Sequence, residues 1–274
     1  MEASLLAALG ERYPIEREIA HGAMATVYLA RDRAGGRQVA VKVMHPRLAD
    51  ALGAERFQRE IAVVRAMDHP LIVPLYASGD AGGTLYYVMP FVPGETLAQR
   101  LERERRLPCA DALRLAADIA DALGYAHARG VLHRDIKPEN ILLQEGRALV
   151  ADFGLARAIG AADYERLTQT GVVVGTAHYM SPEQLLEDRD LDQRTDIYSL
   201  ACILFEMLTG SPPFTGPNLT ELATRILRAP PPSARQLRAE VSERVDRVIV
   251  KALAKSPADR FATMEDFAAV LREG

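Results

Sequence analysis

Cysteine is scarce in this sequence of 274 residues: only Cys109 and Cys202 are present, and they stand far apart along the chain. Two distant cysteines do not make a disulfide framework, and they fit a protein of the reducing cytosol. We expect both to be small, buried or half-buried apolar residues rather than reactive thiols.

Long apolar runs are also missing. The stretch "LACILFEML" at 200–208 is about half of the roughly 18 residues that a membrane-spanning helix needs. The first residues, "MEASLLAALGERY", place no basic region ahead of their short apolar part, so they do not resemble a signal peptide. We therefore expect a cytoplasmic chain with no membrane segment. The alternative is that it is the cytosolic domain of a longer, membrane-anchored protein.

The chain has no excess of positive charge. Its 33 Lys and Arg stand against 37 Asp and Glu, which gives a net charge of −4. Nucleic acids and anionic membranes both select basic surfaces, so neither is expected as a partner. With 49% hydrophobic and 26% charged residues, the composition is that of a globular chain, long enough for one large domain or two modest lobes.

The pattern of the chain changes at about residue 90. Before it, segments rich in β-branched and aromatic residues predict strands at 13–19, 26–32, 37–44, 71–79 and 85–91. One helix, at about 52–67, interrupts them, with an apolar stripe formed by Phe57, Ile61, Val64 and Met67.

After "PFVPGE" at 90–95, helical patterns dominate. They predict helices at about 109–128, 194–209, 218–228, 240–254 and 262–272, short strands at 141–144 and 148–151, and a long irregular stretch at about 155–180. A sheet-rich half followed by a larger helix-rich half indicates two lobes, and the cleft between them is the expected ligand site.

Lys42 lies inside "VAVKVM", where a lysine is most often the solvent-facing member of an alternating strand. Glu60 argues against that interpretation, because it lies on the apolar stripe of the following helix, between Phe57 and Val64. A carboxylate on a buried face is costly unless it is paired. A Lys42–Glu60 ion pair would hold the ammonium group in place, where it suits a phosphate.

The segment "VLHRDIKPENILL" at 131–143 concentrates polar groups between two apolar runs. Asp135 can accept a proton or orient a hydroxyl, Lys137 can neutralise negative charge, and Asn140 offers an oxygen to a hard cation. Pro138 breaks regular structure among them, so the segment is a loop anchored at both ends. Such a loop suits the movement of a charged group.

The segment "LVADFGLA" at 149–156 places Asp152 at the end of a strand that is expected to be buried. Aspartate at such a transition is often only a turn former. Mg²⁺, however, is usually bound by one or two carboxylates together with substrate phosphates, and Asp152 with Asn140 would supply its protein ligands.

Taken together, the chain resembles the eukaryotic-type (Hanks-type) protein kinase family, in particular the bacterial Ser/Thr kinases. Five features occur in the family's order: "VAVK", a helical glutamate, "HRDIKPEN", "DFG" and "SPE". The resemblance runs from about Tyr13 to Phe267. It implies an α+β bilobal fold, with a small lobe at 1–89 made of antiparallel sheet and one regulatory helix, a hinge at 90–94, and a larger, mainly α-helical lobe at 95–274.

The resemblance implies a Ser/Thr protein kinase of bacterial signalling, which transfers the γ-phosphoryl group of ATP to protein hydroxyls. Lys42 would bind the α- and β-phosphates and pair with Glu60, Asp135 would be the catalytic base, and Lys137 would contact the transferring phosphoryl group. The implied ligands of Mg²⁺ are Asn140 and Asp152, and Mn²⁺ is compatible with the same positions.

The positions that would enclose ATP are Ile19, Gly22, Val27, Ala40, Lys42, Met89, Pro90, Val92 and Leu142. Met89 matches the family's gatekeeper. Pro90 has no N–H, but only its carbonyl would meet the adenine, whereas Val92 would supply an N–H.

The glycine-rich loop departs from the family's G-x-G-x-x-G pattern. It has Ala20, Gly22 and Ala25 at the three glycine positions. The two alanines add one methyl group each and need a negative φ but little room. The loop is therefore expected to be stiffened rather than broken.

The stretch 156–184 matches the activation segment. We expect autophosphorylation at Thr168, Thr170 or both, with the phosphate pairing with Arg134 and ordering the segment. The implied structural residues are His133, Phe153, Thr176, Glu183, Asp196 and Arg260. Among these, His133 and Phe153 would stack with Val64 and Leu75, Thr176 would hydrogen-bond near Asp135, Glu183 would pair with Arg260, and Asp196 would brace the catalytic loop.

Two other functions remain open. A pseudokinase would use the fold as a binding module, although every catalytic position is filled. A small-molecule kinase is disfavoured by Lys137 and by "GTAHYMSPE", which resemble the branch that acts on Ser and Thr of protein substrates. By analogy with related bacterial kinases, two copies could form a homodimer through their small lobes.

Overall fold

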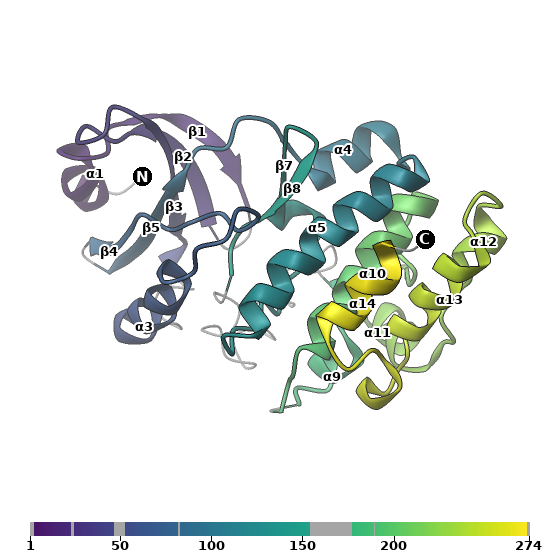
Figure 1. Ribbon diagram of the computed structural model, residues 1–274. Coiled ribbons are helices and arrows are strands. Elements are labelled where there is room, and N and C mark those ends of the chain that lie inside the picture. The colour runs from purple at the N-terminus through teal and green to yellow at the C-terminus, as the bar shows by residue number, and fades with distance from the viewer. Residues whose placement is uncertain are drawn as a thin grey trace. The chain divides into compact units, whose positions relative to one another are not determined.

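The computed structural model describes residues 3–22, 25–46, 53–81, 83–153, 177–188 and 190–272, which fall into two compact units (Figure 1). Of these residues, the first unit contains those up to Asp68 and Val73–Pro93. The second contains His69–Ile72, Gly94–Phe153 and those from Ala177 onward. The chain therefore passes between the units at 68–69, 72–73 and 93–94.

The first unit is built on a five-stranded antiparallel sheet of strand order β1-β2-β3-β5-β4. Its strands are β1 (Ile15–His21), β2 (Ala25–Arg31), β3 (Gln38–Met44), β4 (Ala77–Ala81) and β5 (Thr84–Pro90). Together with helix α3 (Ala54–Arg65), they match the small lobe that the sequence predicts.

Helix α3 buries the apolar stripe that the sequence predicts, with Phe57, Ile61 and Val64 inside. Glu60, expected on that buried face, is only half-buried, so the cost of holding its carboxylate there is smaller than the sequence suggests. The reason is its position at the margin of the stripe, beside the exposed Arg59.

The strand predicted over 71–79 is wrong for most of that range, because β4 begins only at Ala77. Pro74 lacks the N–H that a strand needs for pairing, which explains why the preceding residues stay irregular. Within the second unit, Ile72 instead forms an isolated parallel bridge with Val150.

Helix α1 (Ala3–Gly10) was not predicted from the sequence. Its Leu5 and Leu9, four residues apart, point to the same side and pack with Tyr13 onto one face of the sheet. That face is apolar, and its central strands contribute Val39, Val41, Val43 and Val88. The helix therefore completes the core of the first unit.

The second unit is mainly helical. Its helices are α4 (Leu97–Glu104), α5 (Cys109–His127), α9 (Pro182–Leu185), α10 (Arg194–Thr209), α11 (Leu219–Arg228), α12 (Ala234–Leu237), α13 (Glu243–Ala252) and α14 (Met264–Arg272). A small antiparallel sheet has the order β6 (Glu95–Thr96), β7 (Ile141–Gln144), β8 (Arg147–Val150). The sequence predicted α5, α10, α11, α13, α14, β7 and β8, but not α4, α9 or α12.

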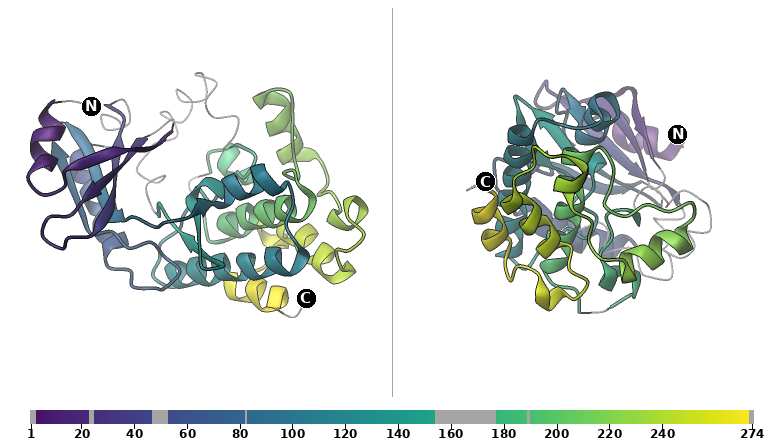
Figure 2. Two further views of the ribbon diagram at one scale, coloured as in Figure 1. Left: turned by 90° about the horizontal axis from the view of Figure 1, so that it is seen from above. Right: turned by 90° about the vertical axis from the view of Figure 1, so that its right-hand side faces the viewer.

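Helix α10 is the centre of this unit, since 13 of its 16 residues are buried. Helices α5, α13 and α14 pack against it (Figure 2). Among its buried residues is Cys202, and burial raises the pKa of this thiol well above its usual value, so it is an inert core residue as expected.

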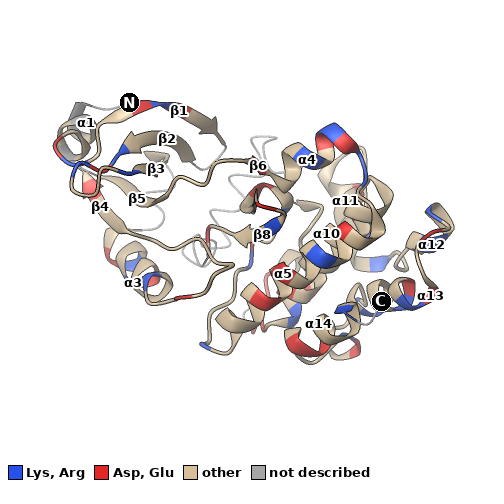
Figure 3. Cartoon of the chain, turned by 45° about the horizontal axis from the view of Figure 1, so that its top comes forward, with Lys and Arg blue, Asp and Glu red and all other residues tan. Residues whose placement is uncertain are grey.

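Basic and acidic residues are interspersed along α3, α4 and α13 (Figure 3). In the part of the chain that the structure describes, no helix combines the length and apolar character that crossing a membrane requires.

We expect Leu9→Ala to destabilise the first unit. The Leu9 side chain is fully buried, and its truncation should lower the free energy of unfolding by about 2–5 kcal/mol. Urea unfolding followed by circular dichroism measures this effect. Ala7→Ser, at an exposed position of the same helix, is the control. An unchanged midpoint for Leu9→Ala would show that α1 does not contribute to the core.

Candidate active site

The loop between α5 and β7 brings Asp135, Lys137 and Asn140 together. The Lys137 Nζ lies 2.8 Å from Asp135 Oδ2 and 3.1 Å from Oδ1. Asn140 ends the short 3-10 helix Pro138–Asn140, and its Nδ2 donates to the Asp135 carbonyl at 2.8 Å and to Oδ2 at 3.2 Å. The three polar side chains that the sequence singled out thus form one connected cluster.

The cluster keeps Lys137 charged. Burial would lower the pKa of this ammonium group, but Asp135, with Glu139 and Asp152, outweighs burial and raises the pKa above its usual value. A permanent positive charge therefore lies beside a carboxylate that can accept a proton. This combination suits a reaction in which a hydroxyl is deprotonated while negative charge develops next to it.

Two residues of this region have an unusual backbone. Arg134 has φ 67° and Asp152 has φ 65°, a left-handed conformation that non-glycine residues rarely adopt. Asp152 is the second residue after β8, at the turn that the sequence predicts. Such strained residues persist only when the surrounding structure holds them, and they concentrate at functional sites.

Asp196 of α10 is one of the groups that hold the loop. Its fully buried carboxylate accepts the backbone N–H of His133 at 2.9 Å and of Arg134 at 2.8 Å. His127, at the end of α5, also lies 2.7 Å from it through Nε2. Two direct hydrogen bonds therefore support the bracing role expected for Asp196. His127 is a further partner, which was not predicted from the sequence.

The His133 side chain ties the loop to the end of β8. Its Nε2 is 2.9 Å from the Ala151 carbonyl oxygen, and its ring centroid is 4.7 Å from that of Phe153. The stacking expected between His133 and Phe153 is present. The stacking partners expected from the first unit, Val64 and Leu75, stay a prediction.

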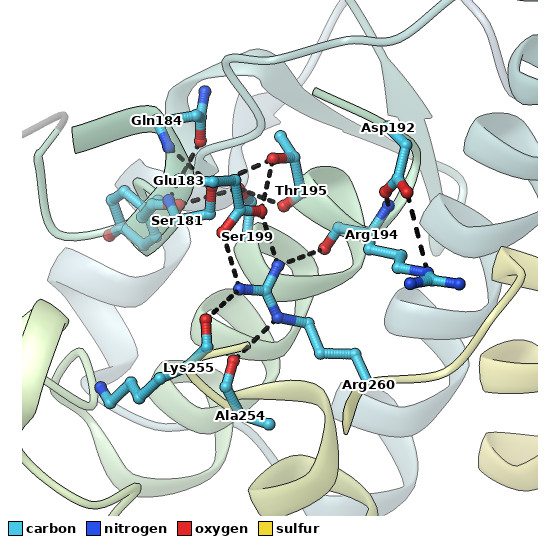
Figure 4. Close-up of polar contacts among 11 residues, drawn as sticks. Ser181, Glu183, Gln184, Asp192, Arg194, Thr195, Ser199, Ala254, Lys255 and Arg260 are labelled. Atoms are coloured by element: carbon cyan, nitrogen blue, oxygen red, sulfur yellow. Dashed lines mark hydrogen bonds and ion pairs between the residues drawn. The ribbon is translucent and has the colours of Figure 1, made fainter. Parts of the chain in front are cut away.

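Helix α9, capped by Ser181, carries the ion pair that the sequence predicts between Glu183 and Arg260 (Figure 4). The pair is bidentate, with both N···O distances at 2.7 Å. Thr195 Oγ1 donates to Glu183 at 2.7 Å and lies 3.0 Å from Ser181 Oγ. Burial would raise the pKa of Glu183, but the hydrogen bonds and charge of Arg260 lower it below its usual value.

Arg260 has no N–H group left over. Besides the two bonds to Glu183, its guanidinium donates to the backbone carbonyls of Arg194, Ala254 and Lys255. These five bonds match the five donors of an arginine. The ion pair thus joins α9 to the start of α10 and to the segment after α13.

The first unit carries most of the positions expected around the nucleotide. Strand register sets Lys42 opposite both Val27 and Tyr87, and Ala40 opposite Met89. Directly opposed residues of an antiparallel sheet share a face, so these side chains line one side of the sheet. Lys42 is half-buried, and its expected ion pair with Glu60 stays a prediction.

The glycine-rich loop starts at the end of β1. The N–H of Gly22 donates to the Ala25 carbonyl at 3.0 Å, and a Cβ added to Gly22 would make only ordinary contact with that oxygen, at 3.5 Å. Neither Ala20 nor Ala25 has a positive φ, as expected. Within the described residues, packing and backbone conformation do not require a glycine at position 22.

The other residues expected around the nucleotide lie on or near strands and are only partly buried. Ile19 lies half-buried on β1, Pro90 ends β5 opposite Val39, and Val92 and Leu142 are half-buried. The activation-segment threonines Thr168, Thr170 and Thr176 lie outside the described residues.

A divalent cation would have few protein ligands here. The described residues contain no group of three or more His, Cys, Asp or Glu side chains that could bind a metal ion. Asn140 and Asp152 fit the pattern of Mg²⁺, which usually takes one or two protein ligands and completes its coordination with water and phosphate oxygens. The donor set is therefore compatible with a metal that arrives with a nucleotide.

Gln184 and Thr195 are also residues that the sequence analysis missed. Gln184 was detectable in part, because "SPEQ" at 181–184 has the S-x-x-Q spacing of a helix capping box. The distant partners of Gln184 and Thr195 leave no signal in a single sequence.

A model of the protein kinase domain matches residues 13–270. The chain is 41% identical to the serine/threonine-protein kinase PknB of Mycobacterium leprae, over 96% of this chain and 43% of that protein. It is 39% identical to the serine/threonine-protein kinase PrkC of Bacillus subtilis, over 95% of this chain and 40% of that protein. The chain thus spans less than half the length of these relatives. The crystal structure of the Mycobacterium tuberculosis PknI kinase domain is similar with a TM-score of 0.75 at 32% identity, covering 95% of both chains.

We expect Arg260→Ala to yield a poorly folded protein. The change strands the buried Glu183 carboxylate and should lower stability by roughly 3–5 kcal/mol. Thermal unfolding measures the loss. Arg247→Ala removes the arginine of an exposed pair with Glu243 on α13 and should change the melting temperature little. A stable Arg260→Ala variant would contradict the structural role of the pair.

Acid should selectively weaken the bracing by Asp196. Burial would raise the pKa of Asp196, but its hydrogen bonds from His127 and His133 lower it below the ordinary value. The ionised carboxylate of Asp196 therefore contributes fully to the free energy of unfolding above the pKa of an unfolded aspartate, about 3.9. This contribution is lost as the pH falls further, through the lower pKa of Asp196 in the folded protein. The difference in melting temperature between the wild type and Asp196→Asn should shrink from pH 7 to pH 3.5. A constant difference would contradict this.

Proposed function

Because this chain belongs to the protein kinase family, we propose that it transfers the γ-phosphoryl group of ATP to Ser or Thr hydroxyls of proteins, as a bacterial serine/threonine kinase domain. The observation that carries the proposal is the cluster of Asp135, Lys137 and Asn140, in which a proton acceptor, a fixed positive charge and an amide lie within hydrogen-bonding distance.

Asp135 is proposed to orient the substrate hydroxyl and accept its proton. Lys137, whose raised pKa keeps it charged, stabilises negative charge on the group being transferred. Asn140 and Asp152 would hold Mg²⁺ together with phosphate oxygens, and Mn²⁺ fits the same oxygen ligands. When bound, the metal neutralises charge on the phosphates.

The nucleotide is assigned to the residues Ile19, Gly22, Val27, Ala40, Lys42, Met89, Pro90, Val92 and Leu142. Support comes from the shared face of Val27, Ala40, Lys42 and Met89. Gly22 adds a second argument: since none of the described residues around it requires a glycine, the small residue suits close approach of backbone N–H groups to a phosphate.

Regulation is proposed through the activation segment. Phosphorylation of Thr168 or Thr170 would add an anion that Arg134, next to Asp135, can bind. We place the domain in the cytosol, where ATP and reduced cysteines fit. Pairing of two copies through the first unit is proposed by analogy with related kinases alone.

We expect the purified wild type, incubated with ATP and Mg²⁺, to incorporate phosphate, and site mapping by mass spectrometry to find Thr168, Thr170 or both modified. Asp135→Asn should lower the rate roughly 10²–10⁴-fold, the usual contribution of a general base. The same variant should keep the thermal shift that ATP and Mg²⁺ produce.

Asp266→Asn is the matched control, because this aspartate is exposed on α14. A wild type that binds ATP but modifies neither itself nor a generic protein substrate would favour the pseudokinase alternative. Activity without modification of either threonine would remove only the regulatory proposal.

A further inference from the structure

Gln184 of α9 makes two hydrogen bonds with opposite ends of its amide group. Its Oε1 accepts the backbone N–H of Ser181 at 3.0 Å, which closes the capping box at the start of the helix. Its Nε2 donates to the Arg134 carbonyl at 2.7 Å, fifty residues earlier in the chain. The two partners fix the orientation of the amide, because a flipped amide would face an N–H with its NH₂ group and a carbonyl with its oxygen.

The accepting carbonyl belongs to the peptide that joins Arg134 to Asp135. On the other side of this peptide, the Asp135 N–H lies 3.3 Å from His133 Nδ1. The preceding peptide is held as well, by the bond from the Arg134 N–H to Asp196. The backbone before Asp135 is strained at Arg134, and its conformation therefore depends on side chains that other elements supply.

The position of Gln184 is itself well fixed. Ser181, which caps α9, contacts Thr195, and both belong to the network of the buried Glu183–Arg260 pair. Gln184 also lines a small crevice together with Arg134 and Asp135. The amide is thus presented to the catalytic loop from a rigid helix end.

We propose that Gln184 is a positioning residue for Asp135: its amide N–H holds the Arg134 carbonyl and so sets the direction in which the Asp135 carboxylate leaves the backbone. This inference rests on the proposed kinase function. It explains why the third residue of α9 is glutamine. Glutamate closes a capping box equally well, but it has no N–H to offer the carbonyl.

The decisive variant is Gln184→Glu, which keeps the size of the side chain and the capping box. At pH 8 the new carboxylate faces the Arg134 carbonyl without a proton between the two oxygens. We expect the single-turnover rate of phosphoryl transfer at saturating ATP to fall roughly tenfold or more, while the KM for ATP stays within about twofold.

The pH dependence of the transfer rate distinguishes a positioning role from a merely structural one, which would not change with pH in this way. The new carboxyl group gains a proton as the pH falls toward the pKa of a glutamate, about 4.3, and the protonated form can donate to the carbonyl. At pH 5.5 about 6% of such a carboxyl group is protonated, so after a tenfold loss the ratio of the variant rate to the wild-type rate should rise by roughly half between pH 8 and pH 5.5. A flat ratio, or a wild-type rate at pH 8, overturns the proposal.

The control is Ser242→Ala, which removes a cap of the same kind from α13, where Ser242 Oγ accepts the Val245 N–H at 3.2 Å. It should lower the melting temperature by roughly 2–4 °C without changing the transfer rate or its pH ratio. An equal loss of rate in Ser242→Ala would reduce the effect of Gln184→Glu to general destabilisation and overturn the proposal.

Amide hydrogen exchange at fixed pH tests the geometry without catalysis. Exchange in the peptide 131–137 should be faster in Gln184→Glu than in the wild type and unchanged in Ser242→Ala. If the wild type is inactive but this difference is found, the kinase proposal fails and the positioning of the loop by Gln184 stands. If exchange is the same in all three proteins, the positioning role is refuted.

Discussion

The hydrogen bonds to Asp196 are the constraint on which the catalytic loop depends. A carboxylate that is fully buried is tolerated only when its oxygens are satisfied, and here two backbone N–H groups and His127 do so. The backbone N–H groups come from His133 and Arg134, so the same bonds that make Asp196 tolerable in the core also hold the strained residue before Asp135. Stability of the helical unit and geometry of the site are therefore not separable at this point.

A second buried charge system, the Glu183–Arg260 pair, plays a corresponding part for helix α9. Arg260 satisfies all five of its donors with Glu183 and three carbonyls, which makes the end of α9 rigid. Buried ion pairs add little net stability compared with apolar packing, because desolvation opposes them. What this pair contributes is a defined position for α9, from which Gln184 reaches the loop.

The sequence predicted those features that are encoded locally. The cluster around Asp135 could be found because its members are close in sequence, and α10 because its largely apolar stretch of 16 residues is too long for a strand. One failure is local, because Pro74 interrupts the strand expected at 71–79 and is visible in the sequence. The others are non-local: helix α1 depends on a sheet face that forms far along the chain, and the Gln184–Arg134 bond spans fifty residues. A single sequence contains no periodicity that reports such contacts.

Helix α1 has a consequence for where the domain begins. The family resemblance starts at residue 13, yet Leu5 and Leu9 pack with Val41 and Val88 on one face of the sheet. A fragment cut at the first recognisable kinase residue would expose that apolar face to water, and an exposed sheet face of this kind promotes association between molecules. The segment that identifies the family is thus shorter than the segment that folds, and the difference is about two turns of helix that have no part in the chemistry.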